Sequence, residues 1–296
     1  MVHLILTGAT GLVGASVLSH ILSLPSTSTP AIHKLSIITR CSSIPWLSTT
    51  PPPGTPAVNK HTQIEVIEHK DFTSYPPDLL ERLKGADACI WALGVSQNDV
   101  SKEQYVTITK DYTMEAAKAF SSLRRSASSS TSGSPSEDKP DGNKKFKFIY
   151  VSGEGATLHP RPWTPLFGRV KGDTEHSLLQ LSKTPPYSNL LSVYSVRPGA
   201  VDGHNQPWLW EPILREKRTA FQRFYLGKAL VPIRRGFLGE GLHTPTEELG
   251  RVLVEMAVGE QQGPFEIGDG VEEEGEGRTL GNKRVRMLGR GEGWWK

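Results

Sequence analysis

The chain has 296 residues, of which 36% are hydrophobic and 22% are charged, and its net charge is +3 at neutral pH. That length is enough for one large domain or two small ones around a sizeable core. The small positive charge forms no basic stripe, which argues against binding to nucleic acid. The chain has no apolar run near the length of about 20 residues that a membrane span needs, and no cleavable signal before its first strand, so we expect a cytoplasmic protein.

The segments of the first two-thirds of the chain alternate between strand-like and helix-like patterns, which favours a parallel sheet covered by helices. The predicted strands are 2–6, 35–39, 64–67 and 86–93, and the predicted helices are 12–24, 78–84 and 102–123. The proline-rich stretch 44–61 predicts a surface excursion between two strands, because proline forbids regular structure there. Strand 86–93 is apolar throughout, as expected for a strand that is buried on both faces.

A serine-rich stretch, at about 122–145, interrupts this alternation. It contains too little apolar surface to order itself, and we predict a disordered insertion. The alternation then resumes with strands at 146–151 and 192–196 and a helix at 170–181 between them. The sequence therefore predicts an α/β fold with a doubly wound parallel sheet, a Rossmann fold, over residues 1–203.

Residues 204–296 break the rhythm and predict a small, mostly helical C-terminal cap that does not fold independently. Its segment Trp208–Tyr225 combines aromatic and basic side chains. This pattern is typical of a lid over an apolar or anionic substrate, and equally of an amphipathic helix packed on the core. A helix is predicted over 245–258, and 284–288 is compatible with a short final strand. The two cysteines, Cys41 and Cys89, have no metal-type spacing, so no metal site is predicted.

The motif TGATGLVG begins at Thr7, between the first predicted strand and the first predicted helix. Its glycines are Gly8, Gly11 and Gly14. Glycine allows a tight turn and a close approach of backbone N–H groups to a pyrophosphate, which then lies at a helix N-terminus. The motif therefore predicts a dinucleotide cradle, completed by the backbone of Thr10, Leu12 and Val13. The alternative is a turn that only packs the helix against the strand.

The end of the second strand indicates which dinucleotide is bound. A carboxylate there would accept hydrogen bonds from the adenosine ribose and select NAD. This chain has Arg40 instead, whose planar guanidinium can pair with a 2′-phosphate. The sequence therefore favours NADP over NAD, and the alternative is a solvated arginine on a loop.

Six segments together carry a resemblance to a known family. In order they are TGATGLVG, Asp71-Phe72, ACIWALG, YVSGEGA, FGRVKGDTE and SVRPGAV. With these segments the sequence resembles an atypical or extended short-chain dehydrogenase/reductase. It is most similar to the branch of the Tat-interacting-protein-like oxidoreductases. The resemblance covers most of residues 1–203.

The resemblance implies a role for residues in each segment. Asp71 and Phe72 would flank the adenine, and Ala92, Leu93 and Gly94 would line the path from adenosine to nicotinamide. Ser152 would polarise a substrate carbonyl, and Lys171 would bind the nicotinamide ribose. Arg197, Pro198 and Gly199 would form the turn that passes the carboxamide. A loop cap at Asp71 and a solvated lysine at Lys171 are the alternatives.

One departure from the family pattern concerns the proton donor. The family has a tyrosine four residues before the lysine, so that both lie on one helical face and the lysine lowers the phenol pKa. Here Phe167 occupies that position, and it has no proton to give. Tyr150, His159 and His176 are alternative donors, as is a water relayed to Lys171.

Two functions follow from these features. The first is an NADP-dependent carbonyl oxidoreductase with a non-standard proton donor, in which Ser152 and Lys171 are the catalytic residues. The second is a non-catalytic NADP(H)-binding protein that senses redox state or regulates a partner. Ser152 and Lys171 favour the first, and Phe167 favours the second. A small-molecule substrate is expected, and a homodimer or a protein partner remains open.

Overall fold

The computed structural model describes residues 1–25, 27, 32–44, 47, 59–124, 144–209, 213 and 243–292. Three predictions fall wholly or mostly outside these residues. They concern the proline-rich excursion, the serine-rich insertion and the segment Trp208–Tyr225.

In this part of the chain, eight strands form one sheet in the order β3-β2-β1-β4-β5-β6-β10-β9. Neighbouring strands run parallel, except for the antiparallel pair β9 and β10. Their bounds are Val2–Thr7 (β1), Ile32–Thr39 (β2), Gln63–Glu68 (β3), Ala88–Trp91 (β4), Phe146–Val151 (β5), Leu191–Val196 (β6), Val271–Glu272 (β9) and Thr279–Leu280 (β10). The predicted doubly wound parallel sheet is confirmed.

The central strands end level with one another. Thr7 of β1 lies beside Trp91 of β4, Trp91 beside Tyr150 of β5, and Tyr150 beside Ser195 of β6. The residues that follow these strands therefore meet at one edge of the sheet, where ligands bind in open parallel sheets. The order reverses between β1 and β4, since the chain goes from β1 outward to β3 and then returns.

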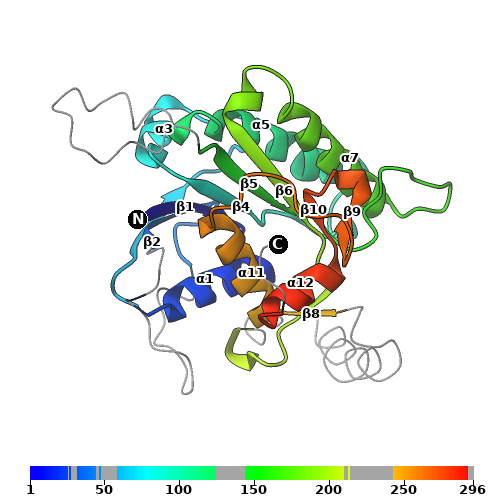
Figure 1. Ribbon diagram of the computed structural model, residues 1–296. Coiled ribbons are helices and arrows are strands. Elements are labelled where there is room, and N and C mark those ends of the chain that lie inside the picture. Colours follow the sequence, from blue (N-terminus) through cyan, green and yellow to red (C-terminus); the bar gives the residue numbers. More distant parts are fainter. Residues whose placement is uncertain are drawn as a thin grey trace.

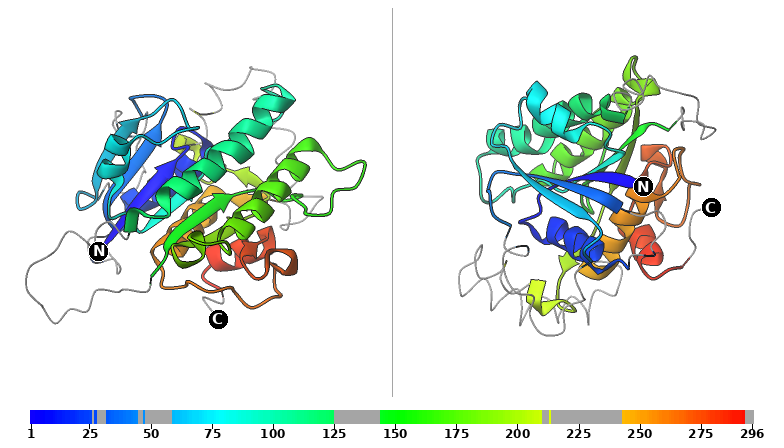
Figure 2. Two further views of the ribbon diagram at one scale, coloured as in Figure 1. Left: turned by 90° about the horizontal axis from the view of Figure 1, so that it is seen from above. Right: turned by 90° about the vertical axis from the view of Figure 1, so that its left-hand side faces the viewer.

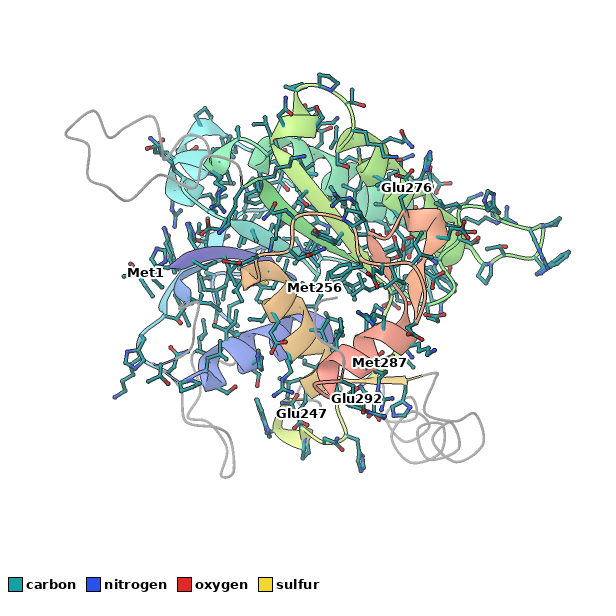
Figure 3. The ribbon with its side chains drawn as sticks, viewed as in Figure 1. Met1, Glu247, Met256, Glu276, Met287 and Glu292 are labelled. Atoms are coloured by element: carbon teal, nitrogen blue, oxygen red, sulfur yellow. The ribbon has the colours of Figure 1, made fainter. Side chains whose placement is uncertain are left out.

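Helices cover both faces of the sheet (Figures 1 and 2). One face carries α1 (Leu12–Ser23), α11 (Thr246–Val258) and α12 (Asn282–Gly289), and the other carries α3 (Pro77–Leu83), α5 (Tyr112–Phe120) and α7 (Leu166–Leu181). Each face has its own apolar core cluster. Met256, labelled in Figure 3, lies among the buried side chains of the first cluster.

Glycine at position 250 allows α1 and α11 to pack closely. A Cβ on Gly250 would lie 2.5 Å from the carbonyl oxygen of Ser16 on α1. Only a residue without a side chain permits this approach. The C-terminal helix α11 is thereby held directly against the helix that follows the glycine motif.

The smaller elements lie around the central sheet. The helix predicted over 102–123 is observed as α4 (Lys102–Val106), a π-helical turn η1 (Thr107–Asp111) and α5. A separate parallel pair joins β7 (Ala200–Asp202) to β8 (His243–Pro245). Short 3₁₀ turns occupy Tyr187–Asn189 (η2) and Glu273–Gly275 (η5). No helix within the described ranges is long and apolar enough to cross a bilayer.

The final segment differs from its prediction, because residues 284–288 form part of helix α12 and not a strand. The alternation of Arg284, Val285 and Arg286 resembles a strand pattern. However, Val285 and Leu288 are spaced three apart and both are fully buried, which is the helical period. The last strands of the sheet are instead β9 and β10, which have two residues each and are too short to show any periodicity. The described C-terminal residues thus add strands to the main sheet as well as helices.

Candidate functional site

The glycine motif forms a turn that only glycine fits at two of its three positions. Gly8 has a φ of +71°, and a Cβ there would lie 2.2 Å from the carbonyl oxygen of Ala92 at the end of β4. A Cβ on Gly14 would lie 2.2 Å from the carbonyl oxygen of Gly8, whereas one on Gly11 would lie 3.3 Å from it. Gly8 and Gly14 therefore let three backbone segments meet.

Helix α1 begins at this turn without any side-chain cap. Gly11 is its N-cap residue, and the first turn of the helix contains no acidic side chain. The first N–H groups of a helix have no partner within the helix, and the positive end of its dipole lies there. The backbone of Thr10, Leu12 and Val13 therefore belongs to an N-terminus that is suited to an anion.

A pocket of about 160 Å³ lies beside this turn, over the ends of β1, β2, β3 and β4. The structure brings eight residues of the predicted cofactor site together in its wall: Gly8, Thr10, Gly11, Arg40, Phe72, Ala92, Leu93 and Gly94. Sequence reasoning missed the other lining residues, which are Ile38, Thr39, Cys41, Lys70, Val95, Ile108 and Tyr112. The pocket has the position of an adenosine site in a doubly wound sheet.

The lining of this pocket is positively charged. Arg40 and Lys70 both belong to it, and its described lining contains no Asp or Glu. Lys70 also forms an ion pair of 2.9 Å with Glu68, and this hydrogen bond raises the pKa of the lysine. The described lining thus carries two cationic side chains, one of which is already paired with a carboxylate.

An aromatic pair forms one wall of the pocket. The ring of Phe72 stacks on Tyr112, with centroids 5.9 Å apart and an angle of 27° between the planes. Two residues at the π-helical turn η1 line the pocket: Ile108 lies within the turn, and Tyr112 directly follows it. π-Helical turns within α-helices are frequent at functional sites. The sequence gives no sign of this turn, so neither residue was foreseen.

Asp71 does not belong to the lining of the pocket. Its carboxylate accepts hydrogen bonds from the backbone N–H and hydroxyl of Thr73 and from the hydroxyl of Ser74. These hydrogen bonds hold the pKa of Asp71 below its usual value. The residue closes the turn next to Phe72, as in the loop-capping alternative.

Ser152 and Lys171 meet at the end of β5. Lys171 Nζ donates a hydrogen bond of 2.6 Å to the backbone carbonyl oxygen of Ser152. The Ser152 side chain is buried, and its Oγ has no hydrogen-bond partner in the described part of the chain. Burial lowers the pKa of Lys171 to about 8, although the nearby Glu175 carboxylate acts in the opposite direction. The end of β5 thus carries a hydroxyl without a described hydrogen-bond partner, and an amine whose pKa is about 8 is bonded to the backbone of the same residue.

Phe167 lies in the first turn of α7, where its backbone N–H donates to Gln97 Oε1 at 2.9 Å. The next residue, Gly168, has a low helix propensity. Its contacts explain why glycine is present. A Cβ on Gly168 would lie 2.5 Å from the carbonyl oxygen of Gly155, and one on Gly172 would lie 2.0 Å from that of Thr157. The two glycines let α7 lie directly against the loop that follows Ser152.

The alternative proton donors His159, His176 and Tyr150 form no hydrogen bond with the side chain of Ser152 or Lys171 in the described part of the chain. His159 is exposed, and it lines a separate surface pocket of about 460 Å³ together with His176. The lining of that pocket includes neither Ser152 nor Lys171. Tyr150 is fully buried, and burial raises the pKa of its phenol well above the ordinary value. The structure therefore favours none of the three side chains as an acid.

Arg197 has a different environment from the one that the resemblance implies. Its guanidinium is buried and donates to both carboxylate oxygens of Glu175 on α7, with the shortest contact at 2.6 Å. This pairing raises the pKa of the arginine. The Arg197 side chain therefore joins the end of β6 to α7. The backbone of Pro198 and Gly199 is then the part of this turn that is left to contact a ligand. The pairing was not foreseen because Glu175 precedes Arg197 by 22 residues.

Two curated relatives are similar to this chain, while no protein-family model matches it. The botcinic acid biosynthesis cluster B protein 16 of Botryotinia fuckeliana (strain B05.10) is 43% identical over 149 residues, which are 48% of this chain and 85% of that protein. The leucinostatins biosynthesis cluster protein T of Purpureocillium lilacinum is 29% identical over 276 residues, which are 86% of this chain and 85% of that protein.

Solved structures share the fold at low identity. MoeE5 in complex with UDP-glucuronic acid and NAD has a TM-score of 0.54 at 16% identity, with 99% of this chain and 94% of that chain covered. An oxidoreductase of the short-chain dehydrogenase/reductase family from Burkholderia thailandensis has a TM-score of 0.52 at 11% identity, with 97% and 93% covered. The chain therefore belongs to the family of the botcinic acid cluster protein, and its fold is that of the short-chain dehydrogenase/reductases.

Proposed function

We propose that this protein binds NADP(H) and acts as a carbonyl oxidoreductase on a small molecule. The observation that carries this proposal is the pocket beside the glycine turn, with the uncapped N-terminus of α1 at one side and Arg40 and Lys70 in its wall. The glycine turn leads directly into the uncapped start of α1 and lines this pocket, so that a pyrophosphate there would meet free backbone N–H groups. The NAD that is bound in the MoeE5 structure, which shares the fold, supports a nicotinamide dinucleotide.

NADP rather than NAD is the form that the charges support. A 2′-phosphate at the end of β2 would find the Arg40 guanidinium and the Lys70 ammonium in the same pocket lining. A free ribose in that position would find no carboxylate among those lining residues. NAD is the less favoured alternative.

The chemistry divides between the dinucleotide and the protein. When bound, the dinucleotide supplies hydride transfer. Ser152 Oγ, which has no partner in the described chain, donates a hydrogen bond to a substrate carbonyl oxygen. The Lys171 ammonium, held at the Ser152 carbonyl, orients the nicotinamide ribose. Phe167 cannot deliver the proton, so water or another side chain delivers it.

The names of the two relatives support a substrate class. Both refer to biosynthesis clusters, of botcinic acid and of leucinostatins. We infer that this chain tailors the product of a similar cluster by oxidising or reducing one of its oxygen functions.

A non-catalytic NADP(H)-binding function is the second candidate, and Phe167 is the observation that favours it. Such a protein would keep the cradle and the charged pocket while lacking the phenol that protonates the product in the family pattern. Measurements of binding and of turnover distinguish the two candidates.

The binding experiment compares NADPH with NADH by titration calorimetry, on the unaltered protein and on Arg40→Ala and Lys70→Ala. Each variant is expected to weaken the binding of NADPH by about tenfold and the binding of NADH by less than about twofold. The reason is that only NADPH carries the 2′-phosphate that accepts the charge-assisted hydrogen bond removed by the substitution. Lys84→Ala, which removes a positive charge outside the pocket lining, is the control. Tighter binding of NADH would overturn the choice of NADP, and no binding of either would overturn the function.

The turnover experiment follows NADPH oxidation with a panel of ketones and aldehydes. The oxidoreductase function predicts activity that Lys171→Ala removes while the fold is kept. Tight binding of NADPH without turnover of any carbonyl would favour the non-catalytic candidate.

A further inference from the structure

A buried polar junction connects the end of β6 to the C-terminal part of the chain. The Gly199 N–H donates to Thr244 Oγ1 at 2.8 Å and to Asn282 Oδ1 at 3.1 Å. The Thr244 hydroxyl in turn donates to the same Asn282 oxygen. Thr244 is 0% exposed and Asn282 is 3% exposed. The two side chains thus fix one backbone N–H from positions far along the chain.

The junction extends to the loop that follows Ser152. The Glu154 N–H donates to the Pro198 carbonyl at 2.8 Å, and the Asn282 N–H donates to Glu154 Oε2 at 3.3 Å. The Pro198–Gly199 turn is therefore tied on one side to the loop after β5 and on the other to the start of α12. Because every bond except the one between the Thr244 and Asn282 side chains involves a backbone group, the junction sets the position of the chain itself.

The topology places this junction next to the second half of a bound dinucleotide. The pocket described above lies at the ends of β1 to β4, and a dinucleotide crosses the point where the strand order reverses. Its other half must then lie over the ends of β4, β5 and β6, which the register holds level. The Pro198–Gly199 turn is the first segment after β6 at that edge.

We propose that Asn282 and Thr244 are positioning residues for the nicotinamide half of the site, which act through the Pro198–Gly199 turn. This proposal rests on the proposed dinucleotide function. Without these two acceptors the half-buried Gly199 N–H would have no protein partner from the C-terminal segment, and the turn would shift to find one. The adenosine half would keep its structure, because none of its lining residues belongs to the junction.

The experiment compares a complete dinucleotide with its adenosine half. NADPH is titrated against adenosine 2′,5′-bisphosphate on Asn282→Ala, Thr244→Val and Thr244→Ser. If the unaltered protein binds NADH more tightly, the pair is NADH and ADP. Asn282→Ala and Thr244→Val are expected to weaken the dinucleotide by about tenfold and the adenosine half by less than about twofold. Thr244→Ser keeps the hydroxyl and is expected to retain affinity for both.

The matched control is Lys283→Ala, which alters the neighbouring residue on α12. Lys283 is exposed, and within the described residues its Nζ pairs with Asp269 on the surface, so its loss should change neither affinity. Thermal unfolding identifies any variant that fails to fold, and the isosteric Thr244→Val then carries the test in place of Asn282→Ala.

Two outcomes overturn the positioning role alone: an equal loss of dinucleotide and adenosine half in both variants, or no loss of either. Failure of the unaltered protein to bind any dinucleotide overturns the proposed function, and this role falls with it.

Discussion

The ammonium of Lys171 and the backbone carbonyl of Ser152 form a hydrogen bond of 2.6 Å that joins α7 to the end of β5. Burial lowers the pKa of this lysine to about 8, so its charge changes within an accessible pH range. The proposed role of Lys171 requires the charged form, which can donate to both Ser152 and a ribose hydroxyl. Affinity for NADPH is therefore predicted to fall as the pH rises through about 8.

Titration of NADPH between about pH 7 and 9.5 checks this prediction, with Lys171→Met expected to bind weakly at every pH. Lys147→Met is the control, because burial also lowers the pKa of Lys147 to about 8 while its Nζ donates to carbonyls of Met256 and Gly259. That variant should keep the pH dependence. A dependence that persists in Lys171→Met would assign it to another group.

Protein stability should change with pH in the opposite direction. The pKa of Lys171 is lower in the folded chain than its ordinary value of 10.5, so the unfolded chain binds more protons between about 8 and 10.5. In that range the contribution of Lys171 to the free energy of unfolding rises with pH, and below it the contribution is constant. Urea unfolding of the unaltered protein and of Lys171→Met is compared at about pH 8 and about pH 10, near the two ends of this range, and should show the unaltered protein gaining stability relative to the variant.

The buried pair of Glu175 and Arg197 is predicted to be sensitive to the loss of one partner. Glu175→Gln leaves an uncompensated guanidinium in a buried place, which typically costs about 3 to 5 kcal/mol of unfolding free energy. Glu276→Gln breaks an exposed pair with Lys183 and should cost less than about 1 kcal/mol. Urea denaturation measures both changes. Similar small costs for the two variants would mean that the buried pair contributes little.

The same substitution should also change the pH profile. The Glu175 carboxylate favours the charged form of Lys171, so Glu175→Gln should lower the pKa of Lys171 further. The midpoint of NADPH binding is then expected below that of the unaltered protein, provided that the variant is folded at the temperature of the titration. A midpoint that moves upward contradicts the electrostatic coupling.

Replacement of Gly172 by alanine is predicted to destabilise the protein, although alanine is the better helix former by about 1 kcal/mol. The reason is the contact with the loop after β5, where the new Cβ would lie 2.0 Å from the carbonyl oxygen of Thr157. Ser177→Ala on the same helix is the control and should leave stability unchanged or slightly raised. The two melting temperatures give the comparison, and a more stable Gly172→Ala would show that the loop yields easily.

Phe167→Tyr restores the phenol of the family pattern, four residues before Lys171. If the pocket is otherwise assembled, NADPH-dependent reduction of a carbonyl should rise by a factor of about 100 or more, which is the usual contribution of general acid catalysis. Phe167→Leu has no hydroxyl and should bring no rise. An unchanged rate in Phe167→Tyr would mean that proton delivery does not limit turnover, or that the site is not catalytic.

The sequence predicted the half of the fold that rests on local signals. The glycine turn at Gly8 to Gly14 and the apolar strands are visible within short windows, and they were found close to their observed bounds. The contributions of Ile108 and Tyr112 to the pocket depend on a π-helical turn that no residue pattern marks. Lys70 was not predicted although it precedes Asp71 directly. The motif at Asp71 does not indicate which of the neighbouring side chains faces the pocket.

Long-range pairing explains the remaining differences. Arg197 belongs to a turn that the resemblance assigns to the cofactor, yet its side chain pairs with Glu175 on another element. Residues 284–288 alternate like a strand, yet burial of Val285 and Leu288 on one face makes them helical. In the first case the deciding partner lies 22 residues away, so a local pattern cannot contain the answer. In the second, the short segment shows both the strand alternation and the helical spacing, and packing against α11 decides between them.

The position of Asn282 also has a consequence for synthesis of the protein. Gly199 is 83 residues before Asn282, so a nascent chain that has emerged only through β6 carries the glycine turn, Ser152 and Lys171 but not this hydrogen-bond acceptor. The turn after β6 is therefore fastened only once Thr244 and Asn282 have been synthesised, whereas the hydrogen bond between Lys171 and Ser152 needs no later residue.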